Sequence, residues 1–431
     1  MYNREDIQEF LRTRVARPAS AGVVIYNDKK EALVLKANYK PYWSFPGGWI
    51  EDNQTPIQAA VRELSEETGI LIIPQRLKFL YIINRVSNIM QSYQFIFEYS
   101  GMIDDFTSIK LQPEEIDDYK FVSREEVLIN LNNYDKIDIV ACGSAYHAGM
   151  IGKYILEDKL DVRIDVASEY RYRKHLDFKN SLLILISQSG ETADTLACLS
   201  NEKNIDSLGI VNVETSRLAR ETKYQMFLKC GSEVAVATTK AYLSQVLMMK
   251  LLRYRLDNDY QKALEYFNKL LINIPKNLKF NYEEIIKLIA KQKKVFFIGR
   301  LIDYAISLEA SLKLKEISYI NAESYPAGEL KHGTISLIEK NTVVIGIITD
   351  EEMALKTSSN LIEVKARGAI TIAVVKKNLK ELVKADYYIE TPEEVDLLTI
   401  IKIQLLSYYV ADLLNREIDK PRNLAKSVTV E

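Results

Sequence analysis

The chain has 431 residues, of which 47% are hydrophobic and 27% are charged, as in an ordinary globular protein with room for two to four domains. Its 57 lysines and arginines nearly balance its 59 aspartates and glutamates, so the charge favours neither nucleic acid nor an anionic membrane as a partner. Three cysteines are too few for a disulfide framework. No stretch is apolar for long enough to cross a bilayer, and the charged N-terminal segment lacks the apolar core of a signal peptide, so we expect a cytoplasmic protein.

The first part of the chain, residues 1–130, predicts strands around one helix. Two short apolar runs separated by a polar turn, and the later alternating run "SYQFIFEYS", have the pattern of strands. Between them, residues 55–70 repeat apolar side chains at helical spacing. Thr55 and Pro56 suit the N-terminus of that helix, and Gly69 suits its end.

From about Tyr134 the pattern changes to repeated units of strand, small-residue loop and helix. Three such units are followed by a long helical stretch, "LDNDYQKALEYFNKLLINI", and then by a second set of units. Continuous β-branched strands alternating with helices indicate parallel sheets whose two faces are both covered. We therefore expect an α/β fold with two doubly wound domains, at 131–275 and 276–431.

Three carboxylates share one face of the predicted helix 55–70. Glu63, Glu66 and Glu67 stand at positions i, i+3 and i+4, where unpaired like charges repel one another. A divalent cation such as Mg²⁺ or Mn²⁺ would remove the repulsion and supply a Lewis acid for a phosphate chain. The alternative is an ordinary solvated acidic face.

The segment 48–70 resembles the Nudix box, whose form is G-x5-E-x7-R-E-U-x-E-E-x-G-U. The resemblance implies an α/β/α sandwich in which the three glutamates bind Mg²⁺ or Mn²⁺. It also implies that water attacks a diphosphate joined to a nucleoside or a sugar, so a nucleotide-sugar is the expected ligand of this domain.

One position departs from the Nudix pattern. Gln54 stands where the pattern has its first glutamate, and an amide can hydrogen-bond Arg62 but cannot bind a metal as an anion or take a proton. Glu51 and Asp52 lie close enough in sequence to substitute. Hydrolysis is the expected activity, and a domain that binds a nucleotide-sugar without cleaving it is the alternative.

Hydroxyl-rich turns follow three predicted strands of the first doubly wound domain. They contain Ser144, the run from Ser187 to Thr192, and residues 236–241. Hydroxyls and backbone N–H groups at helix N-termini form a site for a phosphate dianion, and the carboxyl ends of parallel strands meet at one edge of a sheet. A single turn of this kind would be ordinary helix capping, whereas three in one sheet favour a bound phosphosugar.

The segment "LEASLKLKEISYINAESYPAGELKHG" carries different chemistry. Glu309, Lys313 and Glu316 fall at i, i+4 and i+7 on a helix otherwise rich in leucine, and His332 follows in a loop. Carboxylates, a lysine and a histidine are suited to moving protons about a carbonyl group. A solvated, salt-bridged helix face is the alternative.

From about Tyr134 to Glu431 the chain closely resembles the isomerase half of the glutamine–fructose-6-phosphate aminotransferases. That family of glucosamine-6-phosphate synthases builds this half from two sugar isomerase (SIS) domains. The resemblance extends through "ISQSGETADTL", "LKLKEISYI", "AGELKHG" and "PRNLAKSVTVE". By resemblance, the residues that bind the sugar phosphate are Ser144, Ser187, Gln188, Ser189, Thr192, Val236, Thr238 and Ala425.

The same resemblance implies the catalytic roles. His332, reaching in from a neighbouring subunit, opens the ring of fructose 6-phosphate, so a homodimer or larger assembly is expected. Lys426 forms a Schiff base with the open-chain ketone at C2, and ammonia displaces it. Glu316 then moves a proton from C1 to C2, with Glu309 and Lys313 beside it. A lysine attacks a carbonyl only as the neutral amine, so its pKa must fall, and a C-terminal tail folded over the pocket supplies both the amine and the closure.

Several positions depart from the family pattern. Ser144 and Ala145 stand where Thr and Ser are usual, Thr238 replaces Ser, Thr334 replaces Pro, and Asn321 replaces His. Of the substituted phosphate-site positions, Ala145 loses a hydroxyl, whereas the other two keep one. None of these positions is a proposed proton-transfer group.

A larger departure is that no residue of this chain matches the cysteine nucleophile of the family's glutaminase domain. Ammonia is therefore expected from solution or from a separate glutaminase, unless the reaction runs in reverse as a deamination. Two other interpretations stay open: a ketose–aldose phosphate isomerase without amination, and a non-catalytic sensor of sugar phosphates and nucleotide-sugars. Retention of Glu316, His332 and Lys426 together favours an enzyme over a sensor.

Overall fold

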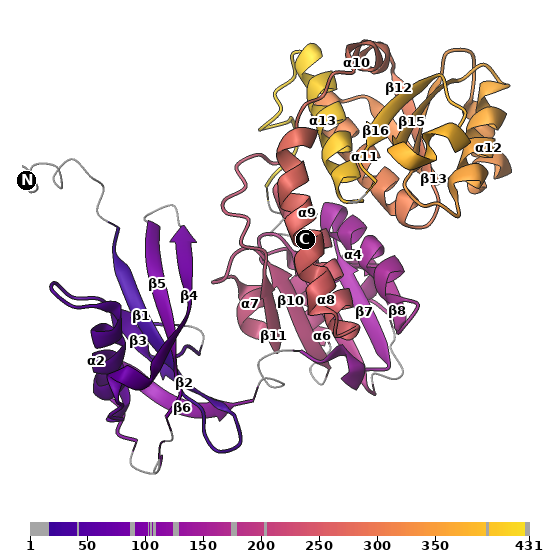
Figure 1. Cartoon of the computed structure of the whole chain (residues 1–431). Helices are drawn as coiled ribbons and strands as arrows, with labels where there is room; N and C mark the ends of the chain where they lie inside the picture. Colours follow the sequence, from indigo (N-terminus) through magenta and orange to yellow (C-terminus); the bar gives the residue numbers. More distant parts are fainter. Residues whose placement is uncertain are drawn as a thin grey trace, which may run out of the picture. The chain divides into compact units, whose positions relative to one another are not determined.

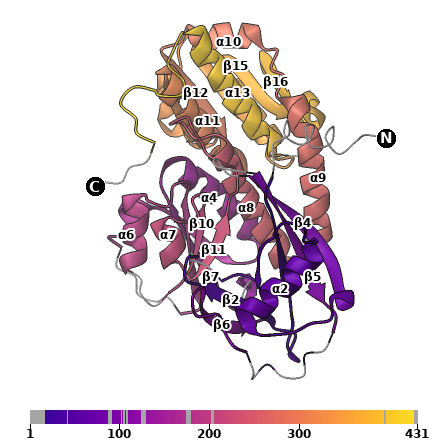
Figure 2. The same ribbon diagram turned by 90° about the vertical axis from the view of Figure 1, so that its left-hand side faces the viewer.

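The computed structural model describes residues 17–426 except 41–42, 87–90, 102, 104–105, 107–108, 124–128, 174–178, 202–204 and 394–395. The charged N-terminal segment and residues 427–431 of the predicted C-terminal tail lie outside the described residues. The chain forms two compact units, Met1–Asn130 and Leu131–Glu431, which Figures 1 and 2 draw in colours that follow the sequence.

The first unit contains a mixed four-stranded sheet, a two-stranded sheet and one described α-helix. Its elements are β1 (Ala19–Val24), β2 (Ala32–Ala37), β3 (Gly47–Trp49), α2 (Pro56–Thr68), the 3-10 helix η1 (Pro74–Arg76), β4 (Leu77–Val86), β5 (Gln91–Tyr99) and β6 (Ile116–Val122). The larger sheet has the order β3-β1-β5-β4, with β1 and β5 parallel and the other neighbours antiparallel. Antiparallel β2 and β6 form the smaller one. The expected α/β class is confirmed for this unit.

Helix α2 begins and ends as its sequence predicts. The Thr55 hydroxyl accepts a hydrogen bond from the backbone N–H of Gln58, and the Gln58 side chain accepts one from the Thr55 N–H, which makes a capping box. Gly69 ends the helix at φ 71°, a left-handed conformation that glycine adopts without strain. Ala60 and Leu64 are fully buried on the core face, and of the three glutamates Glu67 is buried as well.

The second unit begins with a five-stranded parallel sheet of order β11-β10-β9-β7-β8. Its strands are β7 (Lys136–Ala141), β8 (Asp161–Val166), β9 (Ser181–Ser187), β10 (Asp206–Val211) and β11 (Tyr224–Phe227). The helices of this part are η2 (Leu131–Asn133), α4 (Gly143–Leu156), α5 (Ala167–Tyr170), α6 (Ala193–Asn201), α7 (Arg217–Glu221), α8 (Lys240–Leu256) and α9 (Tyr260–Asn277). Every residue of β9 is buried, because helices cover both faces of the sheet.

A second five-stranded parallel sheet has the order β13-β12-β14-β15-β16. Its strands are β12 (Lys294–Gly299), β13 (Asn321–Pro326), β14 (Val343–Ile348), β15 (Ile370–Lys376) and β16 (Tyr387–Thr391). The helices are α10 (Glu283–Ala290), α11 (Ile302–Ser318), η3 (Glu329–His332), η4 (Thr334–Leu337), α12 (Ala354–Lys365), η5 (Lys377–Leu382) and α13 (Leu398–Leu413). The two sheets share one strand order, so the prediction of two doubly wound sheets is confirmed. The predicted boundary at residues 275 and 276 falls inside α9 and stays a prediction.

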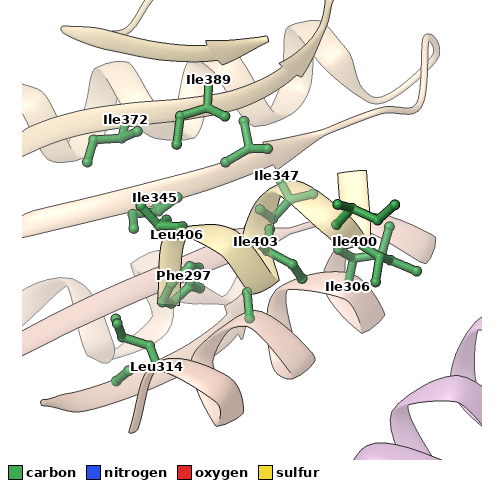
Figure 3. Close-up of a cluster of buried hydrophobic side chains, with 14 of the residues drawn as sticks. Phe297, Ile306, Leu314, Ile345, Ile347, Ile372, Ile389, Ile400, Ile403 and Leu406 are labelled. Atoms are coloured by element: carbon green, nitrogen blue, oxygen red, sulfur yellow. The ribbon is translucent and has the colours of Figure 1, made fainter. Parts of the chain in front are cut away.

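The largest core cluster joins the second sheet to helices α11 and α13, as Figure 3 shows. The labelled side chains are Phe297, Ile306, Leu314, Ile345, Ile347, Ile372, Ile389, Ile400, Ile403 and Leu406. Burial of each such side chain contributes about 1.5–3 kcal/mol to stability. The same cluster includes Ala148 and Ile151 of α4 and Tyr242 of α8. The first helix of one repeat, α4, is therefore packed into the core that holds its counterpart α11.

Candidate active sites

The loop after β9 forms a tight hydroxyl-lined turn. The Ser187 and Thr192 hydroxyls are 2.9 Å apart, and Ser187 Oγ also accepts the backbone N–H of Gly190 at 3.0 Å. Gly190 has φ 67°, and a Cβ there would lie 2.1 Å from Ser216 Oγ, so only glycine fits. The Ser189 hydroxyl accepts the backbone N–H of the residue two positions further along the loop at 3.2 Å. The turn thus holds hydroxyls and amides together where α6 begins, as a phosphate site requires.

Ser144 lies at the same edge of the first sheet as this loop. It follows Gly143 (φ 57°) in the first turn of α4, and it is buried. Because β7 and β9 are paired in register, with Ala141 opposite Ile186, their two loops leave the same edge of the sheet. The structure therefore brings together two of the three turns that the sequence singled out.

The third turn is organised by Glu233, which sequence reasoning missed. The Glu233 side chain, 3% exposed, accepts hydrogen bonds from the Thr238 hydroxyl and from the backbone N–H of Thr239 at 2.7 Å. The backbone N–H of Val236 donates to the Asp419 carbonyl at 2.8 Å, which ties the turn to the C-terminal segment. No short motif signals such a carboxylate, since its role depends on the path of the whole loop.

Lys426 lies against this turn. Its Nζ donates to the Ala235 carbonyl at 2.6 Å and is 3.8 Å from Glu233 Oε2. The preceding segment is held by Tyr319, whose hydroxyl accepts the Arg422 N–H at 2.9 Å and whose ring lies 4.2 Å from the Arg422 guanidinium. Partial burial, together with the positive charge of Lys313, lowers the pKa of Lys426, although Glu233 opposes the shift. Ala425 is exposed.

The charged stripe of α11 is buried rather than solvated. The side chains of Glu309, Lys313 and Glu316 are 0%, 3% and 19% exposed. Lys313 Nζ is 2.5 Å from Glu316 Oε2 and 3.6 Å from Glu309 Oε1. Burial alone would raise the pKa of Glu309, but Lys313 and His147 outweigh burial and hold that pKa below its usual value. Burial would likewise lower the pKa of Lys313, yet the two glutamates raise it.

His147 is largely buried and bonded to Glu309, whereas His332 is exposed. His147 of α4, which the sequence did not single out, has Nδ1 2.7 Å from Glu309 Oε2. His332 is exposed at the end of η3. Within the described part of the chain, no hydrogen bond or ion pair joins His332 to Glu316 or Lys426. Its predicted action on a neighbouring subunit stays a prediction.

In the second sheet, the loop after β14 corresponds in strand order to the loop after β9. Its backbone N–H groups already donate to a carboxylate of the chain. Asp303 is fully buried, and its carboxylate accepts hydrogen bonds from the Thr349 N–H at 2.9 Å, the Thr349 hydroxyl and the Asp350 N–H at 3.3 Å. Burial raises the pKa of Asp303 to about 7. A carboxylate of the chain itself thus accepts the hydrogen bonds of these loop N–H groups, so they are not free to bind an anion.

In the first unit, Arg62 is the centre of the acidic face of α2. Its guanidinium donates to Glu66 Oε2 at 2.6 Å, to Glu63 Oε1 at 2.8 Å and to the Trp49 carbonyl at 2.9 Å. Its Nε is 3.5 Å from Gln54 Oε1. The glutamine at the departing box position therefore still contacts the arginine, as expected from the sequence.

Glu67 is the buried member of the three box glutamates. It is 4% exposed and accepts the Gly47 N–H at 2.7 Å. Burial raises the pKa of Glu67 to about 7 and also raises the pKa of Glu63. Gly48 leaves room for the Glu63 carboxylate, since a Cβ at Gly48 would lie 2.4 Å from it.

These carboxylates fit a divalent cation by their chemistry. Glu67 is buried and Glu63 is half-buried, their negative charge is only partly compensated, and hard cations prefer such oxygen donors. Among the described residues, no three acidic, histidine or cysteine side chains converge closely enough to hold a metal ion as they lie. Arg62 instead donates hydrogen bonds to one carboxylate oxygen of Glu66 and one of Glu63.

Comparison with known families agrees with this division. The protein-family model described as a SIS domain matches residues 130–254 and 288–414, and the NUDIX domain model matches residues 16–141. The two matches overlap across β7, which pairs in the first parallel sheet of the second unit. None of the described helices combines the length and apolar character that a membrane span needs.

Curated relatives of the second unit include the glutamine–fructose-6-phosphate aminotransferase [isomerizing] of Clostridium tetani, 44% identical over 329 residues, which are 72% of this chain and 54% of that protein. The Methanosarcina acetivorans enzyme of the same name is 42% identical over 318 residues, 69% of this chain and 51% of that protein. This chain therefore spans about half the length of the curated relatives that it matches.

Solved structures give the same relationship. The C-terminal domain of glucosamine-fructose-6-phosphate aminotransferase from Francisella tularensis is 37% identical, with a TM-score of 0.61, and the match covers 68% of this chain and 88% of that domain. A glucosamine-6-phosphate deaminase from Thermotoga maritima is 25% identical, with a TM-score of 0.59, over 70% of this chain and 94% of that protein. The chain therefore belongs to the SIS-domain family, with a Nudix domain ahead of two SIS domains related to the isomerase region of the glutamine–fructose-6-phosphate aminotransferases.

Proposed function

We propose that the second unit converts fructose 6-phosphate and ammonia into glucosamine 6-phosphate and water. The observation that carries this proposal is a lysine of lowered pKa within the electrostatic reach of a buried acid–base cluster, because Lys313 contributes to the shift at Lys426. Amination through an imine needs both parts, a neutral amine and a group that moves a proton.

The proposed reaction divides the work among the described groups. Ser187, Gln188, Ser189 and Thr192 hold the 6-phosphate with Ser144 beside them, Val236 and Thr238 face the sugar hydroxyls, and Ala425 belongs to the substrate-binding residues. The Lys426 amine adds to C2 of the open-chain ketose and water leaves, which forms an imine. Ammonia then displaces the lysine, and Glu316 takes a proton from C1 and returns it at C2. Lys313, 2.5 Å from Glu316, holds that carboxylate in place.

A shared site accounts for the exposure of His332. In this proposal His332 opens the sugar ring in the site of a second copy, so the active form is a homodimer or larger. Mixing His332→Ala subunits with Lys426→Arg subunits should restore part of the activity that each lacks alone. A fully active monomer would contradict the shared site.

Two alternatives make different demands on the same groups. A ketose–aldose isomerase needs Glu316 but not the Lys426 amine. A sugar-phosphate sensor needs the turn at 187–192 but no buried acid–base cluster. The Lys426 contacts favour amination over isomerisation, and the buried cluster disfavours the sensor.

The nitrogen source gives the test of this function. The matched family models are a Nudix domain and two SIS domains, and neither supplies a glutaminase. Purified protein should therefore form glucosamine 6-phosphate from fructose 6-phosphate with ammonium and not with glutamine alone, unless a separate glutaminase is added. Lys426→Arg serves as the inactive control. Efficient use of glutamine by the single protein would contradict the proposal.

For the first unit we propose hydrolysis of a nucleoside diphosphate-linked substrate such as a nucleotide-sugar. Glu63, Glu66 and Glu67 would hold Mg²⁺ or Mn²⁺, which would supply Lewis-acid activation of the diphosphate. The chain's own contribution is to keep Glu67 buried against the Gly47 N–H and to position Glu66 through Arg62. A metal-dependent nucleotide-sugar sensor is the second candidate, because Gln54 replaces the first box glutamate.

A further inference from the structure

His147 connects the two SIS halves at the acid–base cluster. It lies on α4, after the first strand of one sheet, and Glu309 lies on α11, after the first strand of the other. The side chains are 12% and 0% exposed, and Nδ1 is 2.7 Å from Glu309 Oε2. The lowered pKa of Glu309 makes it an acceptor, so the hydrogen of this bond belongs to Nδ1.

Lys313 is shared between two carboxylates, and the sharing is unequal. Its Nζ is 2.5 Å from Glu316 Oε2 but 3.6 Å from Glu309 Oε1. Glu309 Oε1 has no hydrogen-bond partner among the described residues. The fully buried carboxylate would therefore be the stronger attractor for the ammonium if it lacked the bond from His147.

We infer that His147 is a positioning residue, which holds Glu309 so that Lys313 stays with the proton-transferring carboxylate Glu316. This inference rests on the proposed function. Without the imidazole, Glu309 Oε2 would lose its 2.7 Å hydrogen bond from His147 Nδ1. Lys313 would then move toward Glu309 and away from Glu316. The substrate would still bind, because the phosphate turn at 187–192 is untouched, but proton transfer would slow.

The other charged and titratable groups around Glu309 do not replace His147. Tyr242 of α8 lies within electrostatic range but carries no positive charge to set against the carboxylate. Ser144 of α4 lowers the pKa of Glu309 through its hydroxyl, but it belongs to the phosphate site. Lys426 interacts electrostatically with Lys313, and it is the amine of the proposed reaction. Among these groups, His147 alone joins Glu309 to the other half without taking part in substrate binding.

A purely structural role makes a different prediction. If His147 only fastened the two halves together, its loss would lower the melting temperature and leave turnover per folded molecule unchanged. Tyr134→Phe provides the matched control, since the Tyr134 hydroxyl donates a bond of the same 2.7 Å length to Asp206. That bond joins the amino ends of β7 and β10, away from the candidate site.

The test compares His147→Leu, His147→Asn and Tyr134→Phe with the wild type. His147→Leu should lower kcat about 10- to 100-fold, the loss expected for a hydrogen bond to a buried charge, while KM for fructose 6-phosphate changes less than about threefold. His147→Asn, whose amide can donate from nearly the position of Nδ1, should recover most of kcat. The control variant, Tyr134→Phe, should keep the kcat of the wild type.

A double-mutant cycle separates action through Glu309 from direct action. Adding His147→Leu to Glu309→Gln should cost little further activity, because the two residues act in one chain. If the leucine variant does not fold, His147→Gln tests the same bond, and its longer arm should give an intermediate loss. Additive losses, or equal impairment of the leucine and asparagine variants, would overturn the inference.

Solvent deuterium exchange at C1 of fructose 6-phosphate keeps this test separate from the proposed function. A wild type that exchanges without aminating would overturn amination and still allow His147 to be judged by the exchange rates. A wild type that aminates, with His147→Leu equal to Tyr134→Phe in kcat, would overturn only the inference about His147. A wild type that does neither would overturn both.

Discussion

Helices α2 and α11 each carry a group of three charged side chains on one face, and the pKa shifts in the two groups run in opposite directions. In α11, Lys313 stands between Glu309 and Glu316, and the pKa of the fully buried Glu309 is held low. In α2 the three groups are all glutamates, and burial raises the pKa of Glu67 to about 7. Burial acts in the same direction on both helices, and the difference lies in Lys313 and His147, which outweigh burial at Glu309.

This comparison indicates what each site still needs. The α11 cluster contains its own counter-charge, because Lys313 is paired with both Glu309 and Glu316. The α2 cluster shares one arginine among Glu63, Glu66 and the neighbouring loop, and Glu67 receives only the Gly47 N–H. Its partly compensated negative charge suits the divalent cation that we propose for this site. Spacing of glutamates alone would not have separated the two cases.

The largest loss of activity is expected from substitution of Lys426, on which Lys313 of α11 acts electrostatically. Lys426→Arg should reduce amination roughly a thousandfold or more, because arginine keeps the charge but does not become a neutral nucleophile at accessible pH. Borohydride should trap fructose 6-phosphate on the wild type and not on the variant. Calorimetry should show that sugar-phosphate binding is retained. Trapping on both proteins would place the imine on another lysine.

Removing the cation from α11 should make this helix resemble α2. In Lys313→Met, two carboxylates lose a buried partner, so we expect about 3–5 kcal/mol less stability and at least a hundredfold lower kcat. The pKa of Glu309 should rise, so the destabilisation should ease at acidic pH. Lys250→Met is a matched control, because it breaks a 2.8 Å pair with Asp396 in the same unit. The control should lose stability and keep kcat; equal losses of kcat would contradict the role given to Lys313.

Features that depend on one helix or one turn could be predicted from the sequence. The register of a helix fixes which side chains share a face, so the spacing of Glu309, Lys313 and Glu316 was enough to group them. The small and hydroxyl residues after β9 likewise predicted a turn with convergent groups, and the Ser187–Thr192 contact has that form.

Features that depend on chain segments far apart could not be predicted in this way. His147 and Glu309 are separated by 162 residues, and nothing local to either predicts their contact. Glu233 accepts the Thr239 N–H only because of the path of the whole loop between them. Asp303 has the sequence position of an ordinary acidic residue in the first turn of a helix, so its burial could not be predicted. Burial of the α11 stripe was equally hidden, since the same spacing occurs on solvated helices.

In the first unit the comparison predicts a pH dependence of stability opposite to that of α11. The pKa of Glu67 in the folded state, about 7, lies above the value of 4.5 for an exposed glutamate. Its favourable contribution is therefore fully present below pH 4.5 and is lost as the pH rises through 7, up to about 3 kcal/mol. Bound Mg²⁺ or Mn²⁺ should restore that stability at alkaline pH, and its affinity should fall as the pH drops below 7 because protons compete for Glu67.

Tryptophan fluorescence can follow this unit by itself, because both tryptophans of the chain, Trp43 and Trp49, lie in it. Unfolding of the full chain should be monitored from pH 5 to 8 with and without Mn²⁺. Glu67→Gln should flatten the metal-free dependence and weaken the effect of Mn²⁺. An unchanged slope in that variant would assign the titration to another group.

The smallest effect is expected at Gln54. Gln54→Glu restores the box pattern and keeps both present contacts, the Glu51 N–H at 3.3 Å and Arg62 Nε at 3.5 Å. The new carboxylate should draw Arg62 from Glu63 and Glu66 and free them for the metal. Because a partly exposed ion pair contributes at most about 1 kcal/mol, hydrolysis and Mn²⁺ affinity should rise only about two- to fivefold.

Gln54→Met, which keeps the length of the side chain and removes the acceptor, is the control and should lower both quantities. The substrates to test are nucleoside diphosphate sugars and dinucleoside polyphosphates, with phosphate-bond cleavage and metal-dependent binding measured separately. A wild type that binds one of them tightly with metal but cleaves none, and gains turnover in Gln54→Glu, would identify the unit as a sensor derived from a hydrolase. In that outcome the missing negative charge at position 54 would affect turnover more than the ion pairs of Arg62 do. One side chain outside both helices would then decide whether the α2 site is catalytic.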